Sequence, residues 1–520
     1  MTIQESGGEG PSPGSSGAPA VPQDETLGRR VVVGARWTLF LRVGTMVTMW
    51  VTTIVLARLL APSQYGVAGM AMVLVAILTV FQESGLHAAL IHRRERVQEA
   101  ADAATAYTPF VAVILVALCL GFAPLAGLFF HRHEVTQLVR GLSIVFLFRA
   151  FSQVPMALLQ KELMFARLTT VLLSGSVLQM AVAIAFASRG AGAWSVIAGL
   201  IAFEAWSAIL MWPLCPLRPH PRRASLQELR ELLGYGRHMV GVSVSGFVNS
   251  YIDISVVGRF LGAASLGAYT IGFQSGKQAV SAVTYASNQV IFPAYAKLQD
   301  DPDRFKRAYL RSLRFVTVIS MPAGLGLAAV SGVFVRVVYG ERWSAAAPVL
   351  AIIAVMGIVL SITTTMGEVL KASGHPNLLL RMSLLQTILV FIAVISFYSF
   401  GIAAVAASQA VAVTVTGVVI TRLTGRILGI DEAEWLKTLL PSALAGGVMA
   451  GTLVLTRFVL GIATSKSTVG VLLLLVVEGT VVYLIAMRVL AAAQLHEFFA
   501  EVARLVDISR IYALLPGGSR

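Results

Sequence analysis

The sequence predicts an all-α polytopic membrane protein with about fourteen transmembrane helices, arranged as two parallel six-helix halves around a central cavity plus two extra C-terminal helices. Three observations predict this fold. Of the 520 residues, 57% are apolar and only 13% are charged, which leaves too little polar surface for a water-soluble globule of this size. The apolar residues gather in blocks near the roughly 20 residues that cross a bilayer as a helix. A stretch of sequence also recurs at a fixed offset, which indicates an internal repeat.

The chain begins with a polar segment. Residues 1–27 are rich in Gly, Ser, Pro and acidic residues, a composition that cannot bury a core and that lacks the apolar run of a signal peptide. We expect a disordered cytoplasmic tail at 1–27, followed by a first span that is not cleaved.

Fourteen apolar runs follow, separated by charged residues. We assign six to an N-terminal half at 28–213 and six to a C-terminal half at 237–425, with a basic cytoplasmic linker at 214–236 between them. Two additional transmembrane helices lie at 426–490. The expected spans are 34–60, 67–91, 105–130, 136–160, 168–188, 191–213, 237–261, 268–292, 313–333, 345–371, 379–399, 401–421, 439–460 and 468–490.

The end of the chain, at 491–520, has an amphipathic pattern. Apolar residues including Leu495, Phe498 and Phe499 recur at helical spacing among Glu497 and other charged residues. This pattern predicts a cytoplasmic amphipathic tail that lies along the inner membrane surface. The alternative is a plain soluble helical extension.

Lysine and arginine are distributed unequally between the two sets of loops. Of the 40, 28 lie on the face that carries both termini, nine lie on the opposite face and three fall within spans. Because Lys and Arg are retained in the cytoplasm, this bias predicts that both termini are inside. The net charge of +14 therefore reflects topology, whereas a protein that binds nucleic acid gathers its basic residues on one solvated face.

Two segments 201 positions apart resemble each other. Residues 58–66 read RLLAPSQYG and residues 259–267 read RFLGAASLG, and the same offset pairs Arg36 with Arg237 at the starts of the first and seventh spans. An even number of spans per half makes the two halves parallel, an arrangement typical of transporters that alternate access to a central cavity. The alternative is that the shared residues describe only a helix end followed by a tight turn.

Three basic residues fall within spans, where an ionised side chain costs at least about 2.5–3.5 kcal/mol. Arg149 and Lys277 lie near mid-span, and Arg42 lies about two turns from the inner end of the first span. We expect these three to line a cationic cavity that binds an anionic substrate, such as a diphosphate or an acidic sugar. The alternatives are an interhelical ion pair, for example Arg149 with Glu204, or a long side chain that extends to the interface.

Acidic residues within spans are candidates for coupling transport to a proton or Na⁺ gradient. Asp253 is the best placed because it lies in a span of the second half, and Glu83 and Glu204 are the other candidates. Glu368 lies one turn from Lys371, so we expect these two residues to pair at the membrane surface.

Several kinds of chemistry are absent from the sequence. Cys119 and Cys215 are its two cysteines and cannot form a disulfide framework, and no Gly-x4-Gly-Lys-Ser/Thr phosphate loop occurs. The cluster His-Arg-His-Glu at 131–134 fits a solvated turn better than a metal site. The expected outer loops are short, which argues against the catalytic groups of a membrane enzyme. We therefore expect no enzyme activity, no cofactor and no metal.

Six short motifs occur in order at expected span ends. They are ARLLAPSQYG at 57–66, QKELMFAR at 160–167, VGRFLG at 257–262 with LGAY at 266–269, FPAY at 292–295 with LQDD at 298–301, GERW at 340–343 with APVL at 347–350, and KASGHP at 371–376. In these motifs the chain resembles the Wzx-type polysaccharide or O-antigen (oligosaccharide) flippases of the multidrug/oligosaccharidyl-lipid/polysaccharide exporter superfamily. The resemblance runs from about Arg29 to Arg488.

This resemblance implies an exporter that moves a polyprenyl-diphosphate-linked oligosaccharide, such as an exopolysaccharide, capsule or O-antigen unit, across the bacterial cytoplasmic membrane by alternating access. It implies membrane lipid, a coupling ion (H⁺ or Na⁺) and other polysaccharide-assembly membrane proteins as partners, and no nucleic acid. The family has no sharply defined motif for its site, so Arg42, Arg149 and Lys277 rest on physical reasoning alone. Two alternatives remain open: a peptidoglycan-precursor flippase or drug/cation exporter of the same superfamily, and a membrane glycosyltransferase or polymerase.

Overall fold

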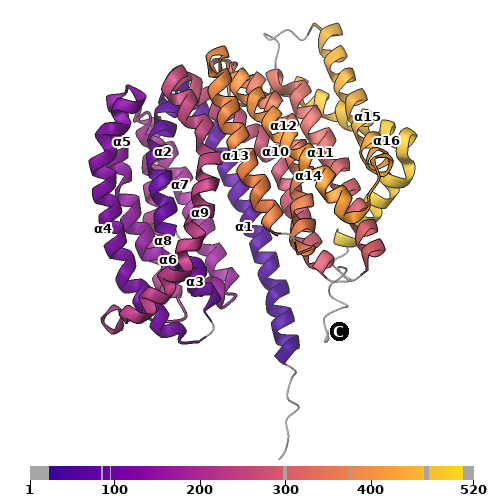
Figure 1. The fold of residues 1–520 in the computed structure, drawn as a ribbon. Coiled ribbons are helices and arrows are strands. Elements are labelled where there is room, and N and C mark those ends of the chain that lie inside the picture. Colours follow the sequence, from indigo (N-terminus) through magenta and orange to yellow (C-terminus); the bar gives the residue numbers. More distant parts are fainter. Residues whose placement is uncertain are drawn as a thin grey trace, which may run out of the picture.

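The helices of this protein stand side by side in a single bundle (Figure 1). The structure is a computed structural model that describes residues 23–83, 86–93, 95–296, 301–374, 376–461 and 468–506. Within these residues, thirteen helical segments are long and apolar enough to cross a membrane. The beginning of the first helix and the end of the last one lie at the same end of the bundle. The predicted all-α membrane fold is therefore confirmed.

The first half comprises eight helices that form six spans, because two of the spans each consist of two consecutive helices. Its third expected span is a single long helix, whereas the second and fourth are each divided in two. α1 packs on α7, α7 on α8, and α6 on both α8 and α4. The helices are α1 (Gln23–Leu59), α2 (Pro62–Glu83), α3 (Leu86–His92), α4 (Val97–Phe130), α5 (His133–Leu142), α6 (Ile144–Lys161), α7 (Phe165–Ser188) and α8 (Trp194–Leu214).

The second half follows a short 3₁₀ turn, η1 (Pro221–Arg223). Its neighbour pattern repeats that of the first half, because α9 packs on α13, α13 on α14, and α12 on both α14 and α11. This repetition agrees with the predicted pair of parallel halves. The elements are α9 (Leu226–Val256), the π-helix η2 (Val257–Leu261), α10 (Gly262–Ala296), α11 (Pro302–Val338), η3 (Glu341–Trp343), α12 (Ala346–Ala372), α13 (Pro376–Phe397), η4 (Tyr398–Phe400) and α14 (Ile402–Leu428).

The thirteen apolar segments and the fourteen predicted spans differ at one place. The segment Asn249–Val280 contains parts of both α9 and α10. Between these helices Gly262 adopts a φ of +85°, a left-handed conformation that glycine tolerates and that redirects the chain. The predicted spans 237–261 and 268–292 lie on the two sides of this turn, so each predicted span corresponds to its own helix.

Two predicted segments can be compared with the bounds of the helices. The predicted tail at 1–27 is too long, because α1 already begins at Gln23; residues 1–22 lie outside the described part of the chain. The predicted span 136–160 lies within the helical segment His133–Lys161, in which Ser143 keeps helical backbone angles and its hydroxyl donates to the carbonyl oxygen of Arg140 at 2.6 Å. Serine hydroxyls often bond back to the preceding helical turn in this way.

Several helix beginnings follow from the local sequence. Asp301 accepts a hydrogen bond from the backbone N–H of Arg304 at 3.0 Å, and Pro302 occupies the first turn of α11. This combination satisfies a free N–H and presets the helical φ. At α15, Asp431 and Glu434 form a capping box, in which each side chain accepts a backbone N–H of the other residue.

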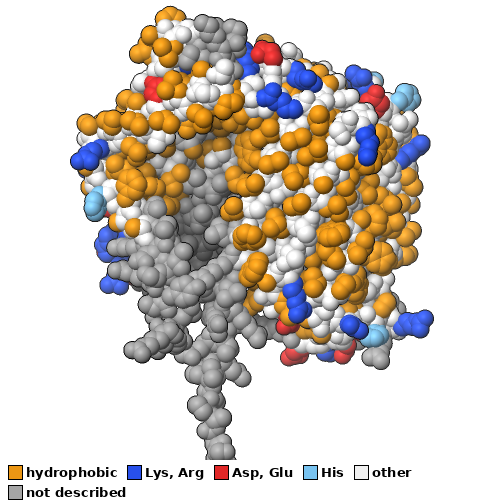
Figure 2. Space-filling model, turned by 180° about the vertical axis from the view of Figure 1, so that it is seen from behind, with side chains coloured by type: hydrophobic (Ala, Val, Ile, Leu, Met, Phe, Trp, Pro, Cys, Tyr) orange, Lys and Arg blue, Asp and Glu red, His pale blue; other side chains and the backbone are white. Residues whose placement is uncertain are grey.

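The two halves contact each other mainly through α2 and α10. These helices touch at their first turns, where Gly66 lies against the backbone of Ala263 and Gly267 lies against that of Pro62. Seen from behind, hydrophobic side chains cover the described middle of the bundle, and Lys, Arg, Asp and Glu side chains lie mostly toward its two ends (Figure 2). A close backbone contact between the halves therefore lies at the end opposite the termini.

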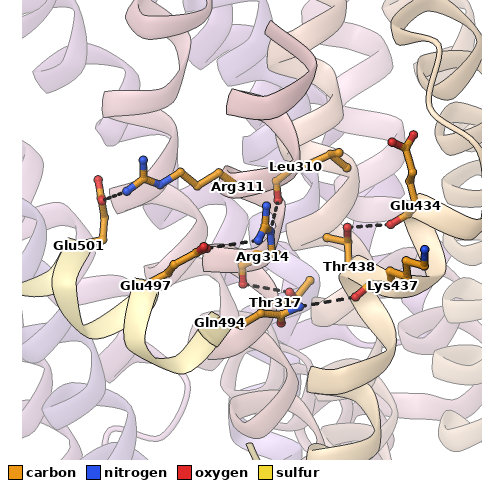
Figure 3. Close-up of polar contacts among 10 residues, drawn as sticks. All are labelled: Leu310, Arg311, Arg314, Thr317, Glu434, Lys437, Thr438, Gln494, Glu497 and Glu501. Atoms are coloured by element: carbon orange, nitrogen blue, oxygen red, sulfur yellow. Dashed lines mark hydrogen bonds and ion pairs between the residues drawn. The ribbon is translucent and has the colours of Figure 1, made fainter. Parts of the chain in front are cut away.

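Two additional helices, α15 (Glu432–Val459) and α16 (Val469–Val506), pack on α11 of the second half. The backbone of α16 is non-helical at Ala491, and the segment beyond this kink contacts the ends of α11 and α15 (Figure 3). Arg311 donates to Glu501 at 2.7 Å and Arg314 donates to Glu497 at 3.2 Å.

The apolar side of this last segment also faces the protein. The ring of Phe498 lies 5.2 Å from the ring of Phe315, measured between centroids. The predicted amphipathic tail is thus helical as far as Val506 and attached to the second half, and its remaining residues, 507–520, lie outside the described part.

Candidate functional site

Two of the three cations expected in the cavity have exposed side chains. Arg42 lies in α1 and Lys277 lies in α10, where its ammonium nitrogen is 5.8 Å from the centre of the Phe273 ring. Next to Lys277, Gln278 donates to the sulfur of Met49 in α1 at 3.1 Å, so the two helices are neighbours at this level.

Arg42 and Met49 are seven residues apart and therefore share one face of α1. Arg42 lies about 10 Å from Met49 along the helix axis, toward the end that carries the termini. Because α1 and α10 belong to different halves, Arg42 and Lys277 place one exposed positive charge on each half.

Arg149 and Glu204 form an ion pair between α6 and α8. The Nε of Arg149 donates to Glu204 Oε1 at 3.1 Å, and its Nη1 donates to the hydroxyl of Thr79 in α2 at 3.2 Å. The side chains retain 22% and 5% exposure. The interhelical pair offered by the sequence as an alternative is therefore present, and in this conformation Arg149 binds a carboxylate of its own half.

Asp253 is buried at the end of α9 in the second half. The hydroxyl of Tyr269 in α10 donates to Asp253 Oδ2 at 2.7 Å and also lies 3.1 Å from Oε1 of Gln409 in α14. The other carboxylate oxygen accepts the backbone N–H of Ile254 at 2.8 Å. Asp253 is 1% exposed. This is a carboxylate held in place by a tyrosine and not by a direct ion pair.

The third acidic candidate, Glu83, ends α2, and its side chain lies outside the described residues. The preceding residue, Gln82, is described and buried. Its Nε2 donates to the carbonyl oxygen of Phe146 at 2.8 Å, and its own carbonyl oxygen accepts Gln153 Nε2 at 3.4 Å. Both glutamines line a small pocket with Tyr107. Sequence reasoning missed these amides because it weighed only charged residues, although a glutamine in the middle of an apolar run is itself a usable signal.

A second unpredicted cluster joins the beginning of α9 to the first half. Glu228, which is 1% exposed, accepts Arg93 Nη2 at 2.6 Å and pairs with Arg96 Nη1 at 2.7 Å. Arg93 also donates to Glu231 at 2.7 Å. This hydrogen bond lowers the pKa of the Glu231 carboxyl and raises the pKa of Arg93.

The described residues contain no group of three or more His, Cys, Asp or Glu side chains that could hold a metal ion. In the cluster at 131–134 all four residues are exposed, and His131 contacts Arg259 of the second half. This cluster is thus part of a contact between the halves.

The chain matches a family model described as "Polysaccharide biosynthesis protein" over residues 55–348. It is 26% identical over 374 residues to the lipopolysaccharide biosynthesis protein WzxC of Escherichia coli strain K12, covering 71% of this chain and 75% of that protein. It is 25% identical over 355 residues to the teichuronic acid biosynthesis protein TuaB of Bacillus subtilis strain 168, covering 68% and 73%. It is 26% identical over 359 residues to the succinoglycan biosynthesis transport protein ExoT of Rhizobium meliloti strain 1021, covering 68% and 71%.

Among solved structures, the lipid II flippase MurJ in an inward closed conformation has a similar fold. The TM-score is 0.71 at 16% identity, with 88% of this chain and 98% of that chain covered. An inward-facing multidrug resistance transporter of the MATE family and MOP superfamily matches with a TM-score of 0.59 at 15% identity, covering 74% and 94%. At such identities the similarity establishes the fold.

Proposed function

Because this chain belongs to the polysaccharide biosynthesis protein family, we propose that it is an exporter that moves a polyprenyl-diphosphate-linked oligosaccharide across the bacterial cytoplasmic membrane. The observation that carries the proposal is a pair of helical halves with the same neighbour pattern, in close backbone contact between α2 and α10. Relatives named for lipopolysaccharide, teichuronic acid and succinoglycan biosynthesis support this substrate class. The work of the protein is transport, with no catalytic step.

A lipid-linked diphosphate requires such a protein for a physical reason. Its charged phosphates and polar sugars cannot enter hydrocarbon without losing their hydration, a cost far above thermal energy. Two halves that separate alternately at each end provide a polar path while the lipid tail stays in the bilayer. The lipid-linked oligosaccharide thus moves from one leaflet to the other without cleavage of any bond.

Arg42 and Lys277 are the residues we assign to the anionic diphosphate or to acidic sugars. Both are exposed and lie on adjacent helices of opposite halves, so one ligand between the halves would meet both charges. Arg149 would join them only after its pair with Glu204 opens. Arg42→Gln and Lys277→Gln should each reduce glycan export, and Arg189→Gln, at an exposed loop position, is the matched control.

Asp253 is the residue we assign to a coupling ion, H⁺ or Na⁺, with Glu204 and Glu83 as further candidates. The supporting observation is its burial beside a hydroxyl and an amide, since these oxygens and the carboxylate can accept a cation or share a proton. Asp253→Asn should abolish the dependence of transport on an ion gradient. Tyr269→Phe keeps the carboxylate and should weaken that dependence less.

We further propose that both termini face the cytoplasm and that the exporter works beside other membrane proteins of polysaccharide assembly. The 28 to nine distribution of basic residues supports the orientation. A thiol introduced before α1 should therefore react with an impermeant reagent only after the cells are opened. Labelling from outside would reverse the assignment.

The direct test measures the leaflet distribution of labelled undecaprenyl-diphosphate oligosaccharide in proteoliposomes, with and without an imposed H⁺ or Na⁺ gradient. Gradient-dependent movement of this lipid supports the proposal. Movement of a peptidoglycan precursor or a cationic drug in its place would assign another substrate of the same superfamily. Sugar transfer by the purified protein would favour a membrane glycosyltransferase or polymerase.

A further inference from the structure

The first span of the first half ends in an arginine that reaches into the other half. The Nε of Arg58, in the last turn of α1, donates to the carbonyl oxygen of Val338 at 3.0 Å, and its Nη2 donates to Val337. Both carbonyls belong to the last turn of α11. Beside Arg58, the buried Trp343 donates its indole N–H to the carbonyl oxygen of Ala57 at 2.7 Å. The end of α1 is thus fixed to the second half by side-chain donors from both directions.

The second half repeats this arrangement with the roles exchanged. Arg259 lies 201 positions after Arg58, in η2, and its Nη1 contacts Nδ1 of His131. His131 caps the end of α4, and the guanidinium carbon of Arg259 lies 5.8 Å from the centre of the Phe129 ring. Since α4 and α11 are the third spans of their halves, each arginine reaches the carboxyl-terminal end of the other half's third span.

The chemistry of both contacts favours arginine. The last turn of a helix has unpaired carbonyls and a partial negative charge. A guanidinium remains charged at physiological pH and offers five N–H donors in a fixed fork. One arginine therefore satisfies two carbonyls at α11, and the other combines a ring nitrogen with an aromatic face at α4.

The backbones between the two arginine contacts are also related by this offset. A Cβ atom at Gly66 would lie 1.8 Å from the carbonyl oxygen of Ala263, and one at Gly267 would lie 2.0 Å from that of Pro62. Gly66 with Gly267, and Pro62 with Ala263, are again 201 positions apart. The contact is therefore of the self-complementary kind found at two-fold axes, and any side chain at either glycine would force the helices apart.

We propose that Arg58 and Arg259 form a reciprocal clasp that holds the outer ends of the two halves together, and that both must release the facing helix ends before a substrate leaves on that side. Outer here means the end opposite the termini. Both are positioning residues, because they act on the relation between the halves and not on the substrate. The purpose of the clasp rests on the proposed transport function, whereas its geometry does not.

The test measures how often the outer ends separate. Gly69→Cys places a thiol between α2 and α10, since a Cβ atom there would lie 3.6 Å from Leu266, an ordinary contact. In a background with Cys119→Ala and Cys215→Ala, an impermeant maleimide added outside labels this thiol only when the halves part. Loss of a charge-assisted hydrogen bond shifts such an equilibrium by about tenfold, which corresponds to 1.4 kcal/mol.

We expect Arg58→Ala and Arg259→Ala each to raise the labelling rate by about tenfold, and the double variant to raise it further. His131→Phe should act like Arg259→Ala and add little to it, because the two residues form one contact. Arg189→Ala, at an exposed outer position, should leave the rate unchanged. Gel filtration and thermal unfolding in detergent identify any variant that fails to fold, and Arg58→Lys and Arg259→Lys, which keep the charge, then provide milder replacements.

An unchanged labelling rate in a folded double variant would overturn the clasp, whether or not the protein moves a glycan. A raised rate in a protein that transports none of the offered lipids would support the clasp and reject the proposed function. Transport by the double variant at the wild-type rate, with labelling raised, would show that opening of the outer ends does not limit export and would overturn the second part of the proposal.

Discussion

Replacing Glu204 with leucine should destabilise the first half, because it leaves the charge of Arg149 among apolar helices without its carboxylate. In the wild type Arg149 donates to Glu204 at 3.1 Å and to Thr79 at 3.2 Å. Breaking a buried pair by removing one partner costs about 3–5 kcal/mol. Since the Arg149 side chain retains 22% exposure, some hydration remains, and we expect the lower end of that range, about 3 kcal/mol.

A double-mutant cycle separates the energy of the Arg149–Glu204 ion pair from the contributions of the two side chains alone. Arg149→Met should also destabilise, because it buries the Glu204 carboxylate alone. The double variant should return to within about 1–2 kcal/mol of the wild type, because replacing both charges with apolar groups removes two desolvation costs together. Thermal unfolding in detergent ranks the stabilities of these variants. Glu478→Gln in α16 is the control for a glutamate within another apolar helix.

The cycle also distinguishes the two roles that the sequence leaves open for Arg149, which are substrate binding and an ion pair with Glu204. If the double variant is stable and still exports glycan, Arg149 serves as a structural partner of Glu204. If it is stable but inactive, at least one of the two residues takes part in substrate binding or ion coupling. Glu204→Leu with wild-type stability would refute the reasoning, because it would mean that the charge of Arg149 needs no partner here.

Three further predictions use other contacts. Gly66→Val should lose about 1–3 kcal/mol of stability through overpacking against α10, whereas Gly121→Val, which has open space around it, should unfold at the wild-type temperature. Combining Glu497→Ala with Glu501→Ala should increase hydrogen exchange beyond the kink of α16 and leave exchange in the spans unchanged. If exchange beyond the kink equals that of the wild type, the two ion pairs do not hold this segment against α11. Because the folded-state pKa of Glu231 is lowered, its contribution is present above the ordinary value of 4.5 and is lost as pH falls through the folded value. Exchange at the start of α9 should therefore rise in that acidic range, and Glu231→Gln should show the raised exchange already at neutral pH.

Much of the fold was predictable because crossing a membrane imposes long apolar runs. Each of the fourteen expected spans corresponds to one helix or, at the second and fourth spans, to two consecutive helices. The resemblance to the Wzx-type family is confirmed by the family match and the relatives. The predicted pairing of Glu368 with Lys371 is confirmed at 3.0 Å. These features depend on residues close in sequence or on composition, which a single sequence records directly.

The site was less predictable because its partners are distant in sequence. Asp253 was identified as a buried acid, but its hydrogen bond from Tyr269 depends on how α9 and α10 fold back at Gly262. No sequence pattern singles out Glu228, because its burial between two arginines depends on how α9 packs against the first half. Hydropathy assigns residues to spans but does not specify which helix faces which.

The internal repeat connects the sequence pattern with the packing of the helices. A duplicated half carries the same residues to equivalent places, so a residue at a pseudo-symmetric interface meets its own repeat partner. Gly66 and Gly267 are such a pair, and the arginines at 58 and 259 reach equivalent helix ends on either side of them. An offset read from sequence therefore predicts an interface as well as a fold. The interface is not fully symmetric, because Arg58 contacts backbone carbonyls whereas Arg259 contacts the ring of His131. Loss of the ring nitrogen of His131 should therefore weaken only one of the two contacts, so His131→Phe should raise labelling of Gly69→Cys in the wild type and have no further effect once Arg259 is alanine.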